Sequence, residues 1–129
     1  MESVSEKVDT QRARVEQLEK ELEKERNAYD KLLEAAVAYR AVWTGLKREA
    51  RDCHNRALRA YARHLELEEE NKDKVEVDHA TGAIVRFAWM DFLKANKSYR
   101  TACEKANTYR RKYDVRDSNE LTPVSFSGF

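Results

Sequence analysis

Proline and glycine are scarce in this chain of 129 residues, which contains one proline and three glycines. Proline breaks helices and glycine weakens them, so their scarcity leaves room for long uninterrupted helices. The sequence also lacks a glycine-rich phosphate loop, a nucleophile elbow and a convergent pair of carboxylates. We therefore expect no enzymatic activity, no catalytic residue and no cofactor.

A long hydrophobic run is missing as well, since no stretch approaches the roughly 18 apolar residues that span a bilayer. The first residues, Met-Glu-Ser-Val-Ser-Glu-Lys, have no apolar segment of a secretory signal. We therefore expect a cytoplasmic protein in which Cys53 and Cys103 are free thiols, packed as small hydrophobic side chains. Adjacent helical residues point about 100° apart, so Cys53 and His54 cannot easily share a metal ion, and we predict no metal site.

Charged residues make up 38% of the chain, and apolar residues recur among them every three or four positions. With heptad position a at Met1, this apolar seam continues from Val4 to Leu67, and only Gln11, Glu25 and His64 interrupt positions a and d. Such a seam predicts a long helix, over residues 2–70, that coils against a partner. Over residues 2–33 the stripe is narrow, which suits one partner helix. The expected dimer seam consists of Val4, Val8, Val15, Leu18, Leu22 and Leu32.

From Ala28 onward the apolar stripe widens, which indicates packing against more than one neighbouring helix. A run of seven acidic residues and two lysines over 66–78 then dilutes the pattern, and we expect a loop at 71–82. A second seam predicts a helix over 83–116, with Asp78 or Thr81 as its N-cap. Residues 74–87 also fit a β-hairpin, and the sequence leaves this alternative open. Gly45 keeps the heptad phase, so we interpret it as a packing position or a mild bend.

The lengths of the two predicted helices favour an all-α antiparallel hairpin of residues 1–116. At 1.5 Å per residue the helices extend about 100 Å and about 50 Å, so the second covers only the wide stripe of the first. The narrow seam then lacks an intramolecular partner, and we expect a homodimer with a four-helix region and an N-terminal coiled-coil arm. The strand orientation of this dimer stays open. Residues 117–129 contain the proline and no periodicity, and we expect a disordered tail.

Folding back through the loop also predicts which residues face each other. If Arg63 lies opposite Asp91, Cys53 lies opposite residue 101, close to Cys103, and Trp43 lies opposite residues 109–113. The aromatic residues near these positions are expected to pack between the helices rather than to line a ligand site. The predicted hairpin core comprises Tyr39, Trp43, Leu46, Phe92, Tyr99, Tyr109 and Tyr113.

Charge is distributed unevenly along the chain although its net value is +1. Residues 40–63 carry seven basic and two acidic side chains, and residues 86–116 carry nine basic and three acidic ones. A basic hairpin of this kind attracts anionic partners, although a merely solvated helical surface has a similar composition. The candidate surface for an anionic partner comprises Arg48, Arg51, Arg59, Lys97, Arg100, Arg110 and Arg111.

These patterns favour a non-enzymatic structural or adaptor module that acts through coiled-coil self-association and through helix-mediated binding of other proteins. The expected partners are a second copy of the chain and other helical proteins. The alternative is a basic helical scaffold that binds anionic membrane surfaces or nucleic acid. No aromatic platform or recognition motif makes the nucleic-acid interpretation specific.

Overall fold

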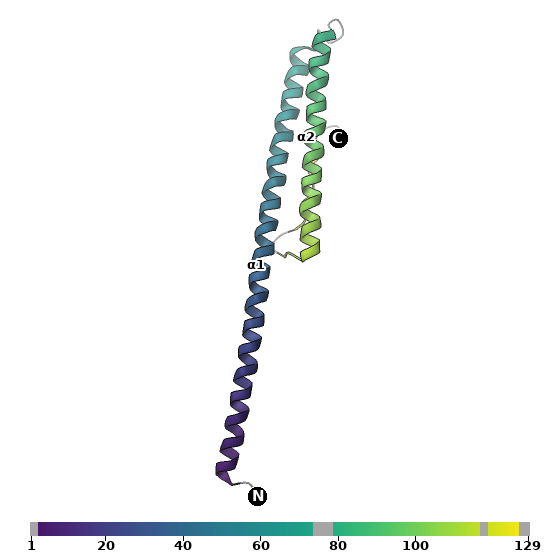
Figure 1. Cartoon of the computed structure of the whole chain (residues 1–129). Helices are drawn as coiled ribbons and strands as arrows, with labels where there is room; N and C mark the ends of the chain where they lie inside the picture. Colours follow the sequence, from purple (N-terminus) through teal and green to yellow (C-terminus); the bar gives the residue numbers. More distant parts are fainter. Residues whose placement is uncertain (1–2, 74–78, 117–118, 127–129) are drawn as a thin grey trace. The chain divides into compact units, whose positions relative to one another are not determined.

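The computed structural model describes residues 3–73, 79–116 and 119–126. These residues form two long helices, α1 (Val4–Glu70) and α2 (His79–Tyr113), and no β-strand is found among them. The chain divides into two compact units, Met1–Ala38 and Tyr39–Phe129, so α1 contributes to both. Within the second unit, α2 runs back along α1 as a helical hairpin (Figure 1). The all-α hairpin is thus confirmed, whereas the coiled coil and the dimer stay predictions.

The first turn of α1 is closed by a capping box. The hydroxyl of Ser3 accepts a hydrogen bond from the backbone N–H of Glu6 at 3.2 Å, and the carboxylate of Glu6 accepts one from the N–H of Ser3 at 3.4 Å. At the other end, the Asn71 side chain donates to the carbonyl of Leu67 at 2.8 Å. Both ends therefore satisfy backbone groups that a helix leaves without partners.

The start of α2 differs from the sequence-based expectation. The helix begins at His79, so Thr81 lies inside it, and residues 79–82 are helical rather than part of a loop. Because residues 79–87 are helical, the β-hairpin predicted as an alternative for 74–87 is wrong. Asp78 and the rest of 74–78 lie outside the described residues. The physical reason is burial: in the helix Gly82 and Ala88 become buried, whereas an isolated two-stranded hairpin has no third layer to pack against.

Helix α2 ends three residues earlier than predicted, in a Schellman-type turn. Asp114 adopts a left-handed conformation with φ of 48°, and the N–H of Val115 donates to the carbonyl of Arg110 at 3.1 Å. Asp114 also binds Arg116, with 2.8 Å between the nearest nitrogen and oxygen, which lowers the pKa of the carboxyl group. Directly after this turn Val115 is buried beside Trp43, so the chain packs against the hairpin where α2 ends.

Ring contacts across the hairpin confirm the predicted register to within two residues. The ring centroids of Tyr61 and Phe92 lie 5.0 Å apart, those of His54 and Tyr99 lie 4.6 Å apart, and Tyr39 stacks on Tyr113 at 4.5 Å. These pairs lie along one buried interface between α1 and α2. The core divides into a central cluster around Phe92 and an end cluster around Trp43.

His64 and Gly45, both on α1, differ in burial. His64, which interrupts the apolar seam, is buried, packs 4.8 Å from the ring of Trp89, and its Nε2 lies 3.0 Å from the carboxylate of Glu68. Gly45 is exposed, and a methyl group at this position would meet no atom within 4 Å. Close packing therefore does not explain glycine at this position, and the interpretation of Gly45 as a packing position is wrong.

Residues 119–126, named the C-terminal segment below, have no regular secondary structure but pack against the hairpin. Phe126 is buried in the central cluster, and Leu121 packs against both clusters. The expected disordered tail is therefore wrong for these eight positions, because Leu121 and Phe126 add apolar surface to the core. The other positions of the tail, 117–118 and 127–129, lie outside the described residues.

Candidate functional site

The residues of the expected dimer seam lie on the part of α1 that belongs to the first unit. All six are exposed in the single chain, from 46% for Leu18 to 78% for Val4. They occupy heptad positions a and d, which repeat every 3.5 residues and therefore lie on one side of the helix. A row of exposed aliphatic side chains at this spacing is a chemically suitable surface for a second helix.

The residues of the predicted hairpin core come together in the second unit, although to different degrees. Trp43 and Phe92 are fully buried, and Tyr99 is 5% exposed. Leu46, Tyr109 and Tyr113 are half-buried around the cluster of Trp43. Tyr39 is 37% exposed, yet its ring stacks on that of Tyr113.

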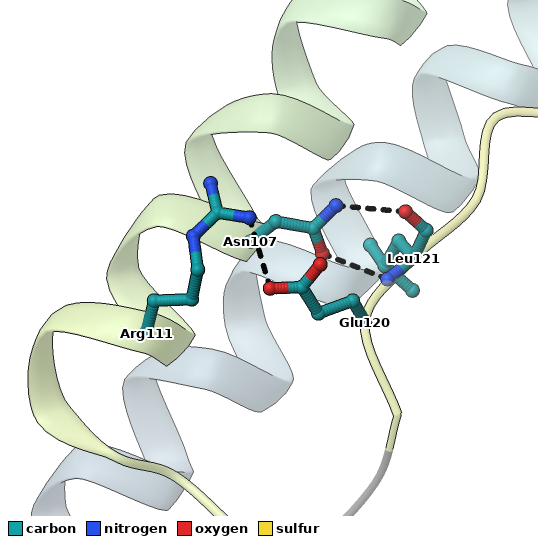
Figure 2. A network of polar contacts seen from close by, with 4 residues as sticks. All are labelled: Asn107, Arg111, Glu120 and Leu121. Carbon is teal, nitrogen blue, oxygen red and sulfur yellow. Dashed lines mark hydrogen bonds and ion pairs between the residues drawn. The ribbon is translucent and has the colours of Figure 1, made fainter.

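A pair of hydrogen bonds holds the C-terminal segment on α2 (Figure 2). The Asn107 carboxamide donates from Nδ2 to the carbonyl of Leu121 and accepts from its N–H through Oδ1, both at 2.7 Å. One turn further along α2, Arg111 forms an ion pair with Glu120 at 2.9 Å. The side chains of α2 thus bind the backbone and one carboxylate of the segment.

The segment is anchored further along by Tyr99 and Phe126. The Tyr99 hydroxyl accepts a hydrogen bond from the N–H of Val124 at 2.8 Å. Burial raises the pKa of this hydroxyl, and the hydrogen bond from Val124 opposes the rise. Phe126 inserts its ring near Phe92, Tyr61 and His54, at centroid distances from 5.0 to 6.0 Å. The segment is therefore fixed at both of its ends.

Basic residues of α1 and the C-terminal segment line two neighbouring open cavities, which we call the basic groove. The larger cavity, of about 430 Å³, is lined by Thr44, Lys47, Arg48, Arg51 and Leu121. The smaller cavity, of about 150 Å³, is lined by Lys47, Ala50, Arg51, His54, Tyr99, Cys103, Leu121 and Thr122. Both cavities share Lys47, Arg51 and Leu121. Because every formally charged side chain along these walls is cationic, the groove is suited to an anionic group.

The structure separates the predicted anion-binding residues into different environments. Arg48 and Arg51 line the basic groove. Arg111 already binds Glu120, and the guanidinium of Arg110 lies 6.0 Å from the centre of the Trp43 ring. The remaining three, Arg59, Lys97 and Arg100, are exposed on the helix surfaces.

The two cysteines are free thiols and lie in the same buried cluster, on opposite helices. Cys53 also lines a cavity of about 240 Å³ with Arg56 and Lys94, and the Arg56 guanidinium lies 3.1 Å from its Sγ. Burial raises the pKa of the Cys103 thiol above its ordinary value, since the interior disfavours the thiolate. The sequence-based register correctly placed these two residues near each other.

Among the described residues, no group of three or more His, Cys, Asp or Glu side chains is arranged to hold a metal ion. None of the described helices has the length and apolar character needed to cross a membrane. Comparison of the chain with protein-family models, curated proteins and solved structures finds no match. The function must therefore be argued from the chain's own residues.

Sequence reasoning missed the contribution of the C-terminal segment and of Asn107. A weak signal was present, because Leu121 and Phe126 are large apolar residues, which gain free energy when they pack against a core. Asn107 carried no comparable signal, since a polar residue on a charged helix is ordinary. Its role depends on a partner 14 positions away along the chain.

Proposed function

We propose that this chain is a non-enzymatic structural or adaptor module that self-associates through residues 4–32 and binds other helical proteins. The observation that carries the proposal is the exposed row of Val4, Val8, Val15, Leu18, Leu22 and Leu32 at heptad spacing. Burying such a row against a second helix removes apolar surface from water, at roughly 25 cal/mol per Å². A second copy of the chain supplies a matching seam.

The test is the mass of the protein in solution, measured by light scattering coupled to size-exclusion chromatography. We expect a dimer for the natural sequence and a monomer for the double variant Leu18→Glu, Leu22→Glu, because charges at positions a and d disfavour the seam. The matched control is Gln17→Glu with Asn27→Glu, which adds the same charge at positions outside the seam and should leave the dimer intact. A double seam variant that keeps its dimer mass would refute association through residues 4–32.

A basic scaffold for anionic membranes or nucleic acid is the second candidate, and the basic groove favours it. Lys47, Arg48 and Arg51 line its larger cavity together. Binding of this kind weakens as salt rises, because it releases counterions or is screened. Liposome co-sedimentation and a nucleic-acid shift assay, each at two salt concentrations, test it. Salt-sensitive binding that Arg48→Gln with Arg51→Gln abolishes would support the scaffold, whereas an adaptor shows none.

A further inference from the structure

Thr122 has the position and surroundings of a phosphorylation site. It is exposed, and it lies in the C-terminal segment, which has no regular secondary structure. Pro123 follows it directly, and this is the only proline in the chain. Serine/threonine kinases bind their substrates as extended backbone, and the proline-directed class accepts proline after the modified residue, where its ring leaves no N–H to be satisfied. Thr122 is therefore the only serine or threonine in the sequence that proline follows.

The smaller cavity of the basic groove brings Thr122 together with cationic residues of α1. Thr122 and Leu121 line this cavity together with Lys47 and Arg51. The described residues that line the groove include no carboxylate. The segment's own acidic residue beside this site, Glu120, is already paired with Arg111. A negative group on Thr122 thus lies in the same cavity as the cationic side chains of Lys47 and Arg51.

We propose that Thr122 is phosphorylated by a proline-directed serine/threonine kinase and that Arg51 and Lys47 hold the phosphate. In the transfer, Thr122 Oγ attacks the γ-phosphorus of magnesium-bound ATP. The bond from that phosphorus to the bridging oxygen breaks, ADP leaves, and the hydroxyl proton passes to the general base of the kinase. The product carries about −1.5 to −2 charges and three acceptor oxygens, which suits charge-assisted hydrogen bonds to a guanidinium and an ammonium group.

The consequence is a firmer attachment of the C-terminal segment to the hairpin. The segment is held by side chains of Asn107, Arg111 and Tyr99, and by the ring of Phe126. Because these contacts hold the segment against the hairpin, a kinase acts on it while it is briefly released. Such release is accessible, since local segments open more easily than whole domains. The new contacts to α1 then favour the docked form. Phosphorylation of Thr122 therefore stabilises the docked form of the segment. This inference is independent of the proposed self-association.

The first experiment measures whether Thr122 is the target. The full chain is incubated with a proline-directed kinase, magnesium and ATP, and the modified residue is located by mass spectrometry. A synthetic peptide of residues 117–129 serves as the positive control for kinase activity. We expect one phosphate, on Thr122, and none on the Thr122→Val or Pro123→Ala variants. Modification of the peptide but not of the full chain, or modification at another residue, would overturn the proposal.

The second experiment measures whether α1 holds the phosphate. A pH titration followed by ³¹P NMR gives the second pKa of phosphothreonine, ordinarily about 6. Nearby cations favour the dianion, so we expect this pKa to be lower by about half a unit or more in the full chain than in the phosphopeptide. Arg51→Gln should remove much of the difference, whereas Arg59→Gln, an equal charge change elsewhere on α1, should preserve it.

Amide hydrogen exchange of residues 119–126 independently measures how often the docked segment opens. We expect exchange to slow about tenfold on phosphorylation of the natural chain, because the docked form opens less often, and to change less in Arg51→Gln. A phosphate pKa equal to that of the peptide, or an unchanged exchange rate, would overturn the assignment of Arg51 and Lys47 as its binding residues.

Discussion

The Asn107 side chain forms both hydrogen bonds that the backbone of Leu121 can offer, one as donor and one as acceptor, each at 2.7 Å. A carboxamide has the same donor and acceptor arrangement as a peptide group, so it binds an extended segment as a neighbouring strand would. This contact joins the C-terminal part of α2 to a segment that has no regular structure of its own (Figure 2). It is the clearest target for testing how the segment is held.

Replacing Asn107 with alanine should release the C-terminal segment. The variant loses two hydrogen bonds and leaves half-buried backbone groups of Leu121 without partners, which costs about 1–3 kcal/mol. We expect faster amide exchange and faster proteolysis within residues 119–126. Thr108→Ala, a change at the exposed neighbouring position, is the matched control and should leave both rates unchanged. Equal rates in the two variants would contradict the role of Asn107.

Trp43 should be an energetic anchor of the hairpin, because its side chain is fully buried in the end cluster. Truncation of a buried tryptophan typically costs about 3–5 kcal/mol, so Trp43→Ala should strongly lower the free energy of unfolding in urea. Val42→Ala, at a side chain that is 48% exposed, should change it far less. In a Trp89→Phe background, fluorescence of Trp43 should be blue-shifted relative to free indole. Emission like that of free indole would mean that the ring is in water.

Gly45 offers a stabilising substitution. It lies within α1, is exposed, and has open space where a methyl group would be added. Alanine is better than glycine in a helix by about 1 kcal/mol, so Gly45→Ala should raise the free energy of unfolding by about this amount. Urea denaturation followed by circular dichroism gives the measurement. A loss of stability would show that glycine is needed here for a reason other than space.

Mild oxidation should join Cys53 to Cys103 within one chain. Both thiols are free and lie in one buried cluster between α1 and α2. We expect a monomeric band on a non-reducing gel and the loss of two hydrogens from the intact mass. The intact mass of the Cys103→Ala monomer should stay unchanged on oxidation, since a single cysteine cannot form this bond. Cross-links found only between chains would contradict the facing positions of the two cysteines.

Stability should decline in alkaline solution because burial raises the pKa of the Cys103 thiol from its ordinary value of 9.0. Above pH 9 the unfolded chain loses this proton while the folded chain keeps it, so the free energy of unfolding falls as pH rises towards the folded pKa. Urea midpoints between pH 8 and pH 10 should decrease less steeply for Cys103→Ala. Identical slopes would show that Cys103 makes no contribution. Tyr99, whose pKa is also raised, extends the decline above pH 10.

Much of the hairpin could be predicted from residue spacing alone. The apolar seams specify helices, and their phase brings Tyr61 near Phe92 and Cys53 into one cluster with Cys103. Helix boundaries were less predictable: α2 starts at His79 instead of residue 83, and Gly82, the last residue of the predicted loop, is buried within it. The aromatic core was predictable because apolar periodicity is a local property of the sequence.

The sequence by itself determined that the chain is helical, which face of each helix is apolar, and approximately how the two helices align. Only the tertiary structure decided that residues 119–126 belong to the core and that Arg51 and Thr122 line the same cavity. The segment has no periodicity of its own, and its hydrogen bonds come from Asn107 and Tyr99, which lie 14 and 25 positions from their partners. Contacts of this kind depend on where the helices are placed in space, so no local pattern records them.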